Sequence, residues 1–159
     1  MTRRTTRFRS TTASESVVRA DREAIWAALT DPVLLPKLTP FLHSIETDGD
    51  LWHWQLARIP VLGIDVVPAF TERMSFDEPR QIVFTHEPPP GRTERAGVEG
   101  RYGLVETAAG TRLSIELAVE VELPLGRLAT PAVTMAMKGV TATMGARFAA
   151  NLLHHIGAR

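Results

Sequence analysis

Residues 111–124, TRLSIELAVEVELP, contain the clearest secondary-structure pattern in the chain. Apolar residues occupy alternate positions from Leu113 to Leu123, and polar residues or alanine stand between them. This period of two is typical of a strand with one buried and one exposed face, as in antiparallel sheets. Pro124 then ends the pattern, because proline cannot donate a ladder hydrogen bond. The stretch therefore predicts the last strand of an antiparallel sheet.

A long helix is predicted after this strand, from about residue 125 to residue 156. Six apolar residues recur at steps of three or four, which places them in one stripe along a helix. They are Val133, Met137, Val140, Met144, Phe148 and Leu152. Gly139 and Gly145 each cost about 1 kcal/mol relative to alanine inside a helix. They indicate either a close approach of another element or simple tolerance in a helix held by packing.

The chain before residue 111 reads as one strand, two short helices and a series of strands. The first helix is expected to have Asp21 as its N-cap and to end at Asp31-Pro32, because the residue before proline avoids helical backbone angles. The predicted strands cover residues 12–20, 42–47, 52–56, 66–76, 81–87 and 98–107, and the second short helix covers residues 33–38.

Composition restricts the class of protein. A chain of 159 residues normally folds as one domain. Lys plus Arg and Asp plus Glu both number 18, and this balance argues against a nucleic-acid-binding protein. The absence of cysteine excludes disulfides, cysteine zinc sites and thiol nucleophiles. No apolar run reaches the roughly 18 residues of a membrane span. We expect a cytoplasmic protein without a membrane span.

The positive charges are concentrated at the start of the chain. Residues 1–10 contain four arginines and no acidic residue, and subtracting these four leaves 14 basic against 18 acidic residues. No apolar segment follows Arg3-Arg4, as a twin-arginine export signal would require. We expect residues 1–11 to form a flexible basic tail and residues 12–159 a single domain. The tail either touches an anionic surface or simply extends from the first strand.

With three local phrases, this order of elements resembles the START-like, or helix-grip, superfamily (SRPBCC). The phrases are DREAIWAALTDP at residues 21–32, EPRQI at residues 78–82 and GTRL at residues 110–113. The nearest branch looks like the polyketide cyclase/dehydrase and lipid-transport families. The resemblance implies an α+β helix-grip fold, in which a curved antiparallel sheet of about seven strands wraps around the C-terminal helix and encloses an apolar cavity. The family has no universal catalytic motif, so the resemblance argues fold better than function.

Two polar residues are predicted to face each other on an otherwise apolar sheet surface. A turn near residues 77–80 sets Glu72 opposite His86, and directly opposed residues lie close enough to hydrogen-bond. A hairpin near residues 61–64 sets Trp54 near Glu72. Glu72 and His86 are therefore the candidate catalytic acid/base pair. The same pair is also consistent with a polar contact to a ligand, or with a salt bridge at the rim of the sheet.

The turn at residues 108–110 leaves two registers open. A three-residue loop with a glycine bulge opposes Thr107 to Thr111 and turns Arg101 inward, where it could bind a ligand carboxylate. A different loop turns Tyr102 inward, and turn chemistry favours the bulge. Including both residues, the candidate ligand-binding set is Trp54, Phe70, Met74, Phe84, Arg101, Tyr102, Leu117, Met137, Val140 and Met144.

No cofactor or metal is expected. None of the five histidines forms a metal-binding spacing, and the chain has no phosphate loop or nucleophile elbow. Three functions are consistent with these features. The first is binding of a small apolar molecule, such as a lipid, fatty acid, polyketide or terpenoid. The second is a polyketide cyclase/dehydratase that uses Glu72 and His86, and the third is a protein-interaction module with a filled cavity. The oligomeric state is left open between a monomer and a homodimer.

Overall fold

A computed structural model describes residues 5–157 of the chain. The helices are α1 (Arg22–Leu29), α2 (Leu35–Leu38) and α3 (Thr130–Ile156), with a 3₁₀ turn at Arg127–Ala129 before α3. The strands are β1 (Thr6–Val18), β2 (Leu42–Asp48), β3 (Leu51–Leu56), β4 (Ile59–Val61), β5 (Ile64–Val66), β6 (Ala69–Asp77), β7 (Gln81–His86), β8 (Ala96–Thr107) and β9 (Gly110–Leu123).

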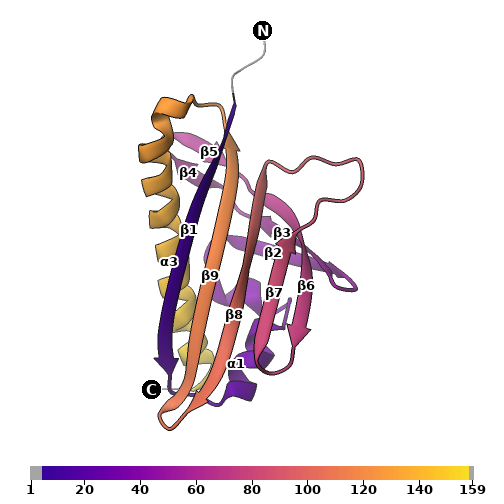
Figure 1. The fold of residues 1–159 in the computed structure, drawn as a ribbon, viewed down its shortest axis with the longest axis vertical. Coiled ribbons are helices and arrows are strands. Elements are labelled where there is room, and N and C mark those ends of the chain that lie inside the picture. Colours follow the sequence, from indigo (N-terminus) through magenta and orange to yellow (C-terminus); the bar gives the residue numbers. More distant parts are fainter. Residues whose placement is uncertain (1–4, 158–159) are drawn as a thin grey trace.

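Seven of these strands form one antiparallel sheet in the order β1-β9-β8-β7-β6-β3-β2, and β4 pairs with β5 in a separate hairpin. α3 lies along one side of the sheet beside β1, with α1 towards one end of the helix and the β4–β5 hairpin towards the other (Figure 1). This arrangement confirms the predicted α+β helix-grip fold with its long C-terminal helix. No helix within residues 5–157 is long and apolar enough to cross a membrane.

The first strand is longer than the sequence predicted. β1 begins at Thr6, not near residue 12, and it pairs with β9 along its whole length, from Thr6 opposite Leu123 to Val18 opposite Thr111. The prediction that residues 1–11 form a flexible tail is therefore wrong for residues 6–11. Phe8 explains the difference, because its side chain is fully buried in the core. Arg3 and Arg4 lie outside the described residues.

The register between β8 and β9 corrects the favoured prediction. Thr107 opposes Gly110, not Thr111, so Ala108 and Ala109 form a two-residue turn. Gly110 has a φ of 137°, far from the value of about +57° of a left-handed glycine bulge. Its Cα approaches the carbonyl of Val18 so closely that a Cβ would collide with that oxygen. Glycine is required there by the neighbouring strand, and the bulge does not form.

The long helix starts five residues later than predicted, at Thr130, after the 3₁₀ turn. It ends at Gly157, which adopts the left-handed conformation (φ 72°) that glycine tolerates best at a helix end. A Cβ added at Gly139 or Gly145 would meet no atom within 4 Å. These two glycines therefore do not mark a close approach, and of the two explanations tolerance is the one that remains.

Candidate functional site

The apolar stripe of α3 is covered at its two ends and accessible in its middle. Val133, Met137 and Leu152 are buried, with exposed fractions of 0%, 5% and 1%. The stripe residues between them are only half-buried, namely Val140, Met144 and Phe148. α3 packs mainly against β1, α1, α2 and β4. The helix is thus held at both ends, and its central apolar side chains keep accessible surface.

The sheet shows the same incomplete coverage at its centre. β8 and β9 are interior strands with neighbours on both sides. Their inner side chains would be fully buried if α3 packed closely against them. Five are instead half-buried, namely Val98, Tyr102, Ile115, Leu117 and Val119. Two accessible apolar surfaces therefore belong to the middle of the helix and the middle of the sheet.

The predicted ligand-binding residues divide between the two faces of the sheet. Alternation along the paired strands places Trp54, Phe70, Met74, Phe84, Tyr102 and Leu117 on the inner face. Met137, Val140 and Met144 belong to the stripe of α3. Arg101 lies on the outer face, where its Nε donates to Oε2 of Glu116 at 2.6 Å. The expectation of an inward Arg101 is wrong, because the two-residue turn at residues 108–109 shifts β8 by one position.

Glu72 is the buried acidic residue of the inner face. It follows Phe70 and precedes Met74 on that face, and its exposed fraction is 2%. Its Oε2 is buried without a hydrogen-bond partner. Burial raises the pKa of the Glu72 carboxyl well above its usual value, and the nearby charge of Glu99 raises it further. The carboxyl therefore favours its neutral, protonated form, because removing it from water penalises the charged form.

Two further polar groups accompany Glu72. The indole Nε1 of Trp54 is also buried without a partner. Burial, and then the charge of Glu72, raise the pKa of the Tyr102 hydroxyl. The predicted pairing of Trp54 with Glu72 differs from the observed register. Trp52 lies opposite Glu72, and Trp54 lies opposite Phe70. The connection from β3 to β6 contains the separate β4–β5 hairpin, which the predicted single turn did not include.

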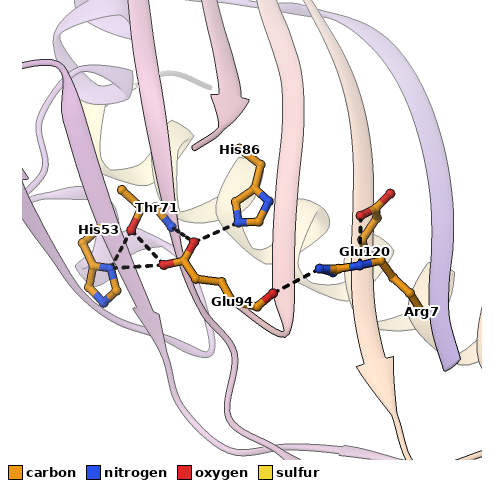
Figure 2. Close-up of polar contacts among 6 residues, drawn as sticks. All are labelled: Arg7, His53, Thr71, His86, Glu94 and Glu120. Atoms are coloured by element: carbon orange, nitrogen blue, oxygen red, sulfur yellow. Dashed lines mark hydrogen bonds and ion pairs between the residues drawn. The ribbon is translucent and has the colours of Figure 1, made fainter. Parts of the chain in front are cut away.

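The backbone of His86 opposes Glu72 as predicted, but its imidazole contacts a different carboxylate. His86 Nε2 lies 2.8 Å from Oε1 of Glu94 (Figure 2). The ring fills space above Gly97, where an added Cβ would lie 2.5 Å from His86 Nδ1. Within residues 5–157 no hydrogen bond joins His86 to Glu72. The structure therefore separates the predicted acid/base pair.

Glu94 is the centre of a polar cluster that sequence reasoning missed (Figure 2). Its Oε1 accepts the backbone N–H of Thr71 at 2.8 Å, and its Oε2 accepts the Thr71 hydroxyl at 2.9 Å. His53 Nδ1 lies 3.1 Å from that hydroxyl oxygen. Arg7 donates to the backbone carbonyl of Glu94 at 3.1 Å and forms an ion pair with Glu120. The cluster joins β1, β3, β6 and β7 to the loop before β8.

Two open hollows lie elsewhere on the molecule. One of about 750 Å³ lies between α1 and the turns after β2 and β6, and Trp26, Trp52 and Phe76 line it together with Glu23 and Glu78. The other, of about 460 Å³, lies on the outer face and includes Arg101 and Glu116. The first hollow includes the inner-face residues Trp52 and Phe76, and of the predicted ligand-binding set only Arg101, on the outer face, lines either hollow. Among the described residues, no group of three or more histidine and acidic side chains is placed to hold a metal ion.

Comparisons with solved structures identify the fold. The sequence matches no protein-family model and no curated protein. A conserved protein from Geobacillus kaustophilus superposes with a TM-score of 0.66 at 20% identity, covering 94% of this chain and 96% of that one. An aromatase/cyclase from a Streptomyces species gives a TM-score of 0.66 at 14% identity, with 94% of each chain covered. A START superfamily protein from Mycobacterium smegmatis gives 0.64 at 17% identity, covering 92% and 97%. The chain has the START-like, helix-grip fold.

Proposed function

We propose that this protein binds a small apolar molecule between α3 and the central strands of its sheet. The observation that carries the proposal is the half-burial of apolar side chains in the middle of both surfaces, while the ends of α3 are fully covered. The proposed ligand is a lipid, fatty acid, polyketide or terpenoid. The matched structures include an aromatase/cyclase and a START superfamily protein, which is consistent with a ligand held inside this fold.

The driving force for binding would be burial of apolar surface. Each Å² of apolar surface removed from water contributes about 25 cal/mol, and part of this gain is spent on ordering the ligand. Leu117 and Val140 would supply such surface from opposite walls. One or two polar groups normally fix the orientation of a ligand in an apolar site, and Glu72 and Trp54 are available for that purpose.

Titration with the neutral fluorescent dye Nile red, together with native mass spectrometry of the purified protein, tests the proposal. We expect saturable dye binding that Leu117→Trp reduces at least about tenfold, because the larger ring fills the central space. Val105→Trp is the matched control, since Val105 is exposed on the outer face of β8. The absence of bound species and of dye binding across a lipid panel would overturn the proposal and favour a protein-interaction module.

A second candidate, polyketide cyclisation with dehydration, is favoured by the buried Glu72, because a carboxyl whose pKa is raised by burial is suited to donate a proton as a general acid. His86 is a weaker partner than the sequence suggested, because its Nε2 contacts Glu94. This reaction requires turnover of a poly-β-ketone substrate that Glu72→Gln lowers by at least about tenfold. The parallel variant His86→Ala tests the second half of the pair. Unchanged turnover in Glu72→Gln would remove the mechanism.

A further inference from the structure

At the described positions of β3, β6, β7, β8 and β9, the inner face of the sheet carries no lysine or arginine. Alternation along the paired strands defines these positions. They are residues 52, 54 and 56 of β3, residues 70, 72, 74 and 76 of β6, residues 82, 84 and 86 of β7, the even residues 96–106 of β8 and the odd residues 111–123 of β9. His86 opposes Glu72 among them, but its imidazole contacts Glu94. Glu72 and Glu106 are the acidic residues among them, and Glu106 lies at the exposed end of β8. The stripe of α3 is entirely apolar.

Three buried polar atoms on this face have no hydrogen-bond partner within residues 5–157, namely Glu72 Oε2, Trp54 Nε1 and, on the edge strand β1, Ser10 Oγ. Glu72 Oε2 and Trp54 Nε1 belong to the neighbouring strands β6 and β3, two residue pairs apart along the ladder and on the same face. A buried polar group without a hydrogen bond is costly, and such groups in folded proteins usually have a partner. Trp54 is itself half-buried, as is Tyr102. Because Trp54 and Tyr102 keep accessible surface, a molecule between α3 and the sheet could contact both side chains.

We propose that the site selects uncharged apolar ligands bearing a hydroxyl or carbonyl oxygen and discriminates against carboxylates, with Glu72 and Trp54 as the hydrogen-bonding residues. This proposal rests on the proposed function and narrows its ligand class. The Trp54 indole donates to the ligand oxygen, as does the Glu72 carboxyl in its protonated form. Fatty acids in their ionised form are disfavoured.

Electrostatics give the physical reason for this selectivity. A carboxylate transferred to an apolar interior needs a cationic partner to offset the loss of its hydration, and the nearest candidate from the sequence, Arg101, is on the outer face with Glu116. The residues directly opposite Glu72 on the neighbouring strands are Trp52 and His86, and the imidazole of His86 is already engaged by Glu94. The nearby groups Tyr102 and Glu99 supply no positive charge. A negative ligand would be buried without a cationic partner, whereas a hydroxyl or carbonyl needs only a donor.

The test uses ligands that share one ring system and differ in one polar group. Nile red displacement at pH 8 is measured with naphthalene, 2-naphthol, 2-acetylnaphthalene and 2-naphthoate, and with dodecan-1-ol against dodecanoate. We expect the alcohols and the ketone to bind at least about tenfold more tightly than the carboxylates. Carboxylates that bind as tightly as the neutral ligands would overturn the selectivity and leave the proposed function intact. Failure of every ligand and of the dye would overturn the proposed function itself.

Variants then separate hydrogen bonding from simple partition into an apolar space. Trp54→Phe keeps an aromatic ring and removes the N–H, so it should weaken 2-acetylnaphthalene binding about three- to tenfold and leave naphthalene unchanged. Glu72→Leu should weaken 2-naphthol binding in the same way, and Glu72→Gln, which retains a donor, should not. Ser75→Ala on the outer face of β6 is the control. Equal losses for naphthalene and for the oxygen-bearing ligands would overturn the role of these residues, and Trp54→Phe decides alone if Glu72→Leu does not fold.

Discussion

Thr71 and Glu72 are adjacent residues of β6 that face opposite sides of the sheet and differ in their hydrogen bonding. Both are buried, with exposed fractions of 5% and 2%. Thr71 faces outward, and its N–H and hydroxyl both bond to Glu94. Glu72 faces inward among apolar side chains, and its Oε2 has no partner. A buried polar group with complete hydrogen bonding stabilises a structure, whereas one left without a partner costs stability.

The largest expected effect comes from removing the centre of the outward cluster. Glu94→Ala leaves the Thr71 N–H and the His86 imidazole without their acceptor, so we expect the free energy of unfolding to fall by about 2–4 kcal/mol. Glu94→Gln keeps an acceptor for the N–H and should cost about half as much. Urea unfolding measures both. A loss below about 0.5 kcal/mol in Glu94→Ala would contradict a structural role for the cluster.

A methyl group at Gly97 should disrupt the same cluster by displacing the His86 ring. The added Cβ would lie 2.5 Å from His86 Nδ1, so the ring must move away from Glu94, at a cost of about 1–3 kcal/mol. Gly103→Ala on the same strand is a matched control, because its Cβ would meet only the Ser114 Cβ at 3.8 Å. Thermal unfolding compares the two variants. Equal melting temperatures would show that the His86 position is not needed.

Replacing the Thr71 hydroxyl by a methyl group tests how much of the cluster depends on side-chain bonding alone. Thr71→Val keeps the N–H bond to Glu94 and removes the hydroxyl contacts to Glu94 and His53. We expect a loss of about 1–2 kcal/mol in unfolding free energy. Thr85→Val, at an exposed position of β7, should stay within about 0.5 kcal/mol of the original protein. A gain in stability from Thr71→Val would contradict a stabilising role for the Thr71 hydroxyl.

Glu72 should give the smallest effect and one of opposite sign. Because its pKa is raised in the folded state, the folded protein binds its proton more tightly than the unfolded chain does. Stability from this group is complete below the ordinary carboxyl pKa and is lost as pH rises towards the folded-state value. Glu72→Gln removes this loss, so we expect it to be more stable than the original at pH 8, by on the order of 1 kcal/mol, and to lose that advantage near pH 4. If the free energies of unfolding of Glu72→Gln and of the original protein differ by the same amount at every pH between 4 and 8, the pKa of Glu72 is not raised in the folded state.

The sequence predicted the register of two strands correctly where a short turn joins them. The turn between β6 and β7 set Glu72 opposite His86, and the structure confirms that register. The prediction was wrong for Trp54, because the β4–β5 hairpin intervenes between β3 and β6, and for Arg101, because Gly110 is required by the carbonyl of Val18. Both errors arise from contacts between segments that are distant in the chain.

Glu94 had no signal in the sequence that could have identified it. It lies in the proline- and glycine-rich loop of residues 88–95, outside any periodic segment. Its partners belong to other elements, at His53 and Thr71, and a single sequence does not show which distant groups a loop carboxylate will meet. The same limit applies to the His86 imidazole, whose direction is set by Glu94 and by the space above Gly97.

By itself the sequence determined the last strand and the long helix that follows it, since the alternation of residues 113–123 and the stripe of residues 133–152 follow from the repeat of each backbone conformation. It also determined that Glu72 lies on an apolar face. Only the tertiary structure decided that His86 bonds to Glu94, that Tyr102 replaces Arg101 on the inner face, and that Glu72 has a carboxyl oxygen without a partner. The physical reason is that periodicity is a local property, whereas the partner of a buried polar group depends on where separate strands and loops meet.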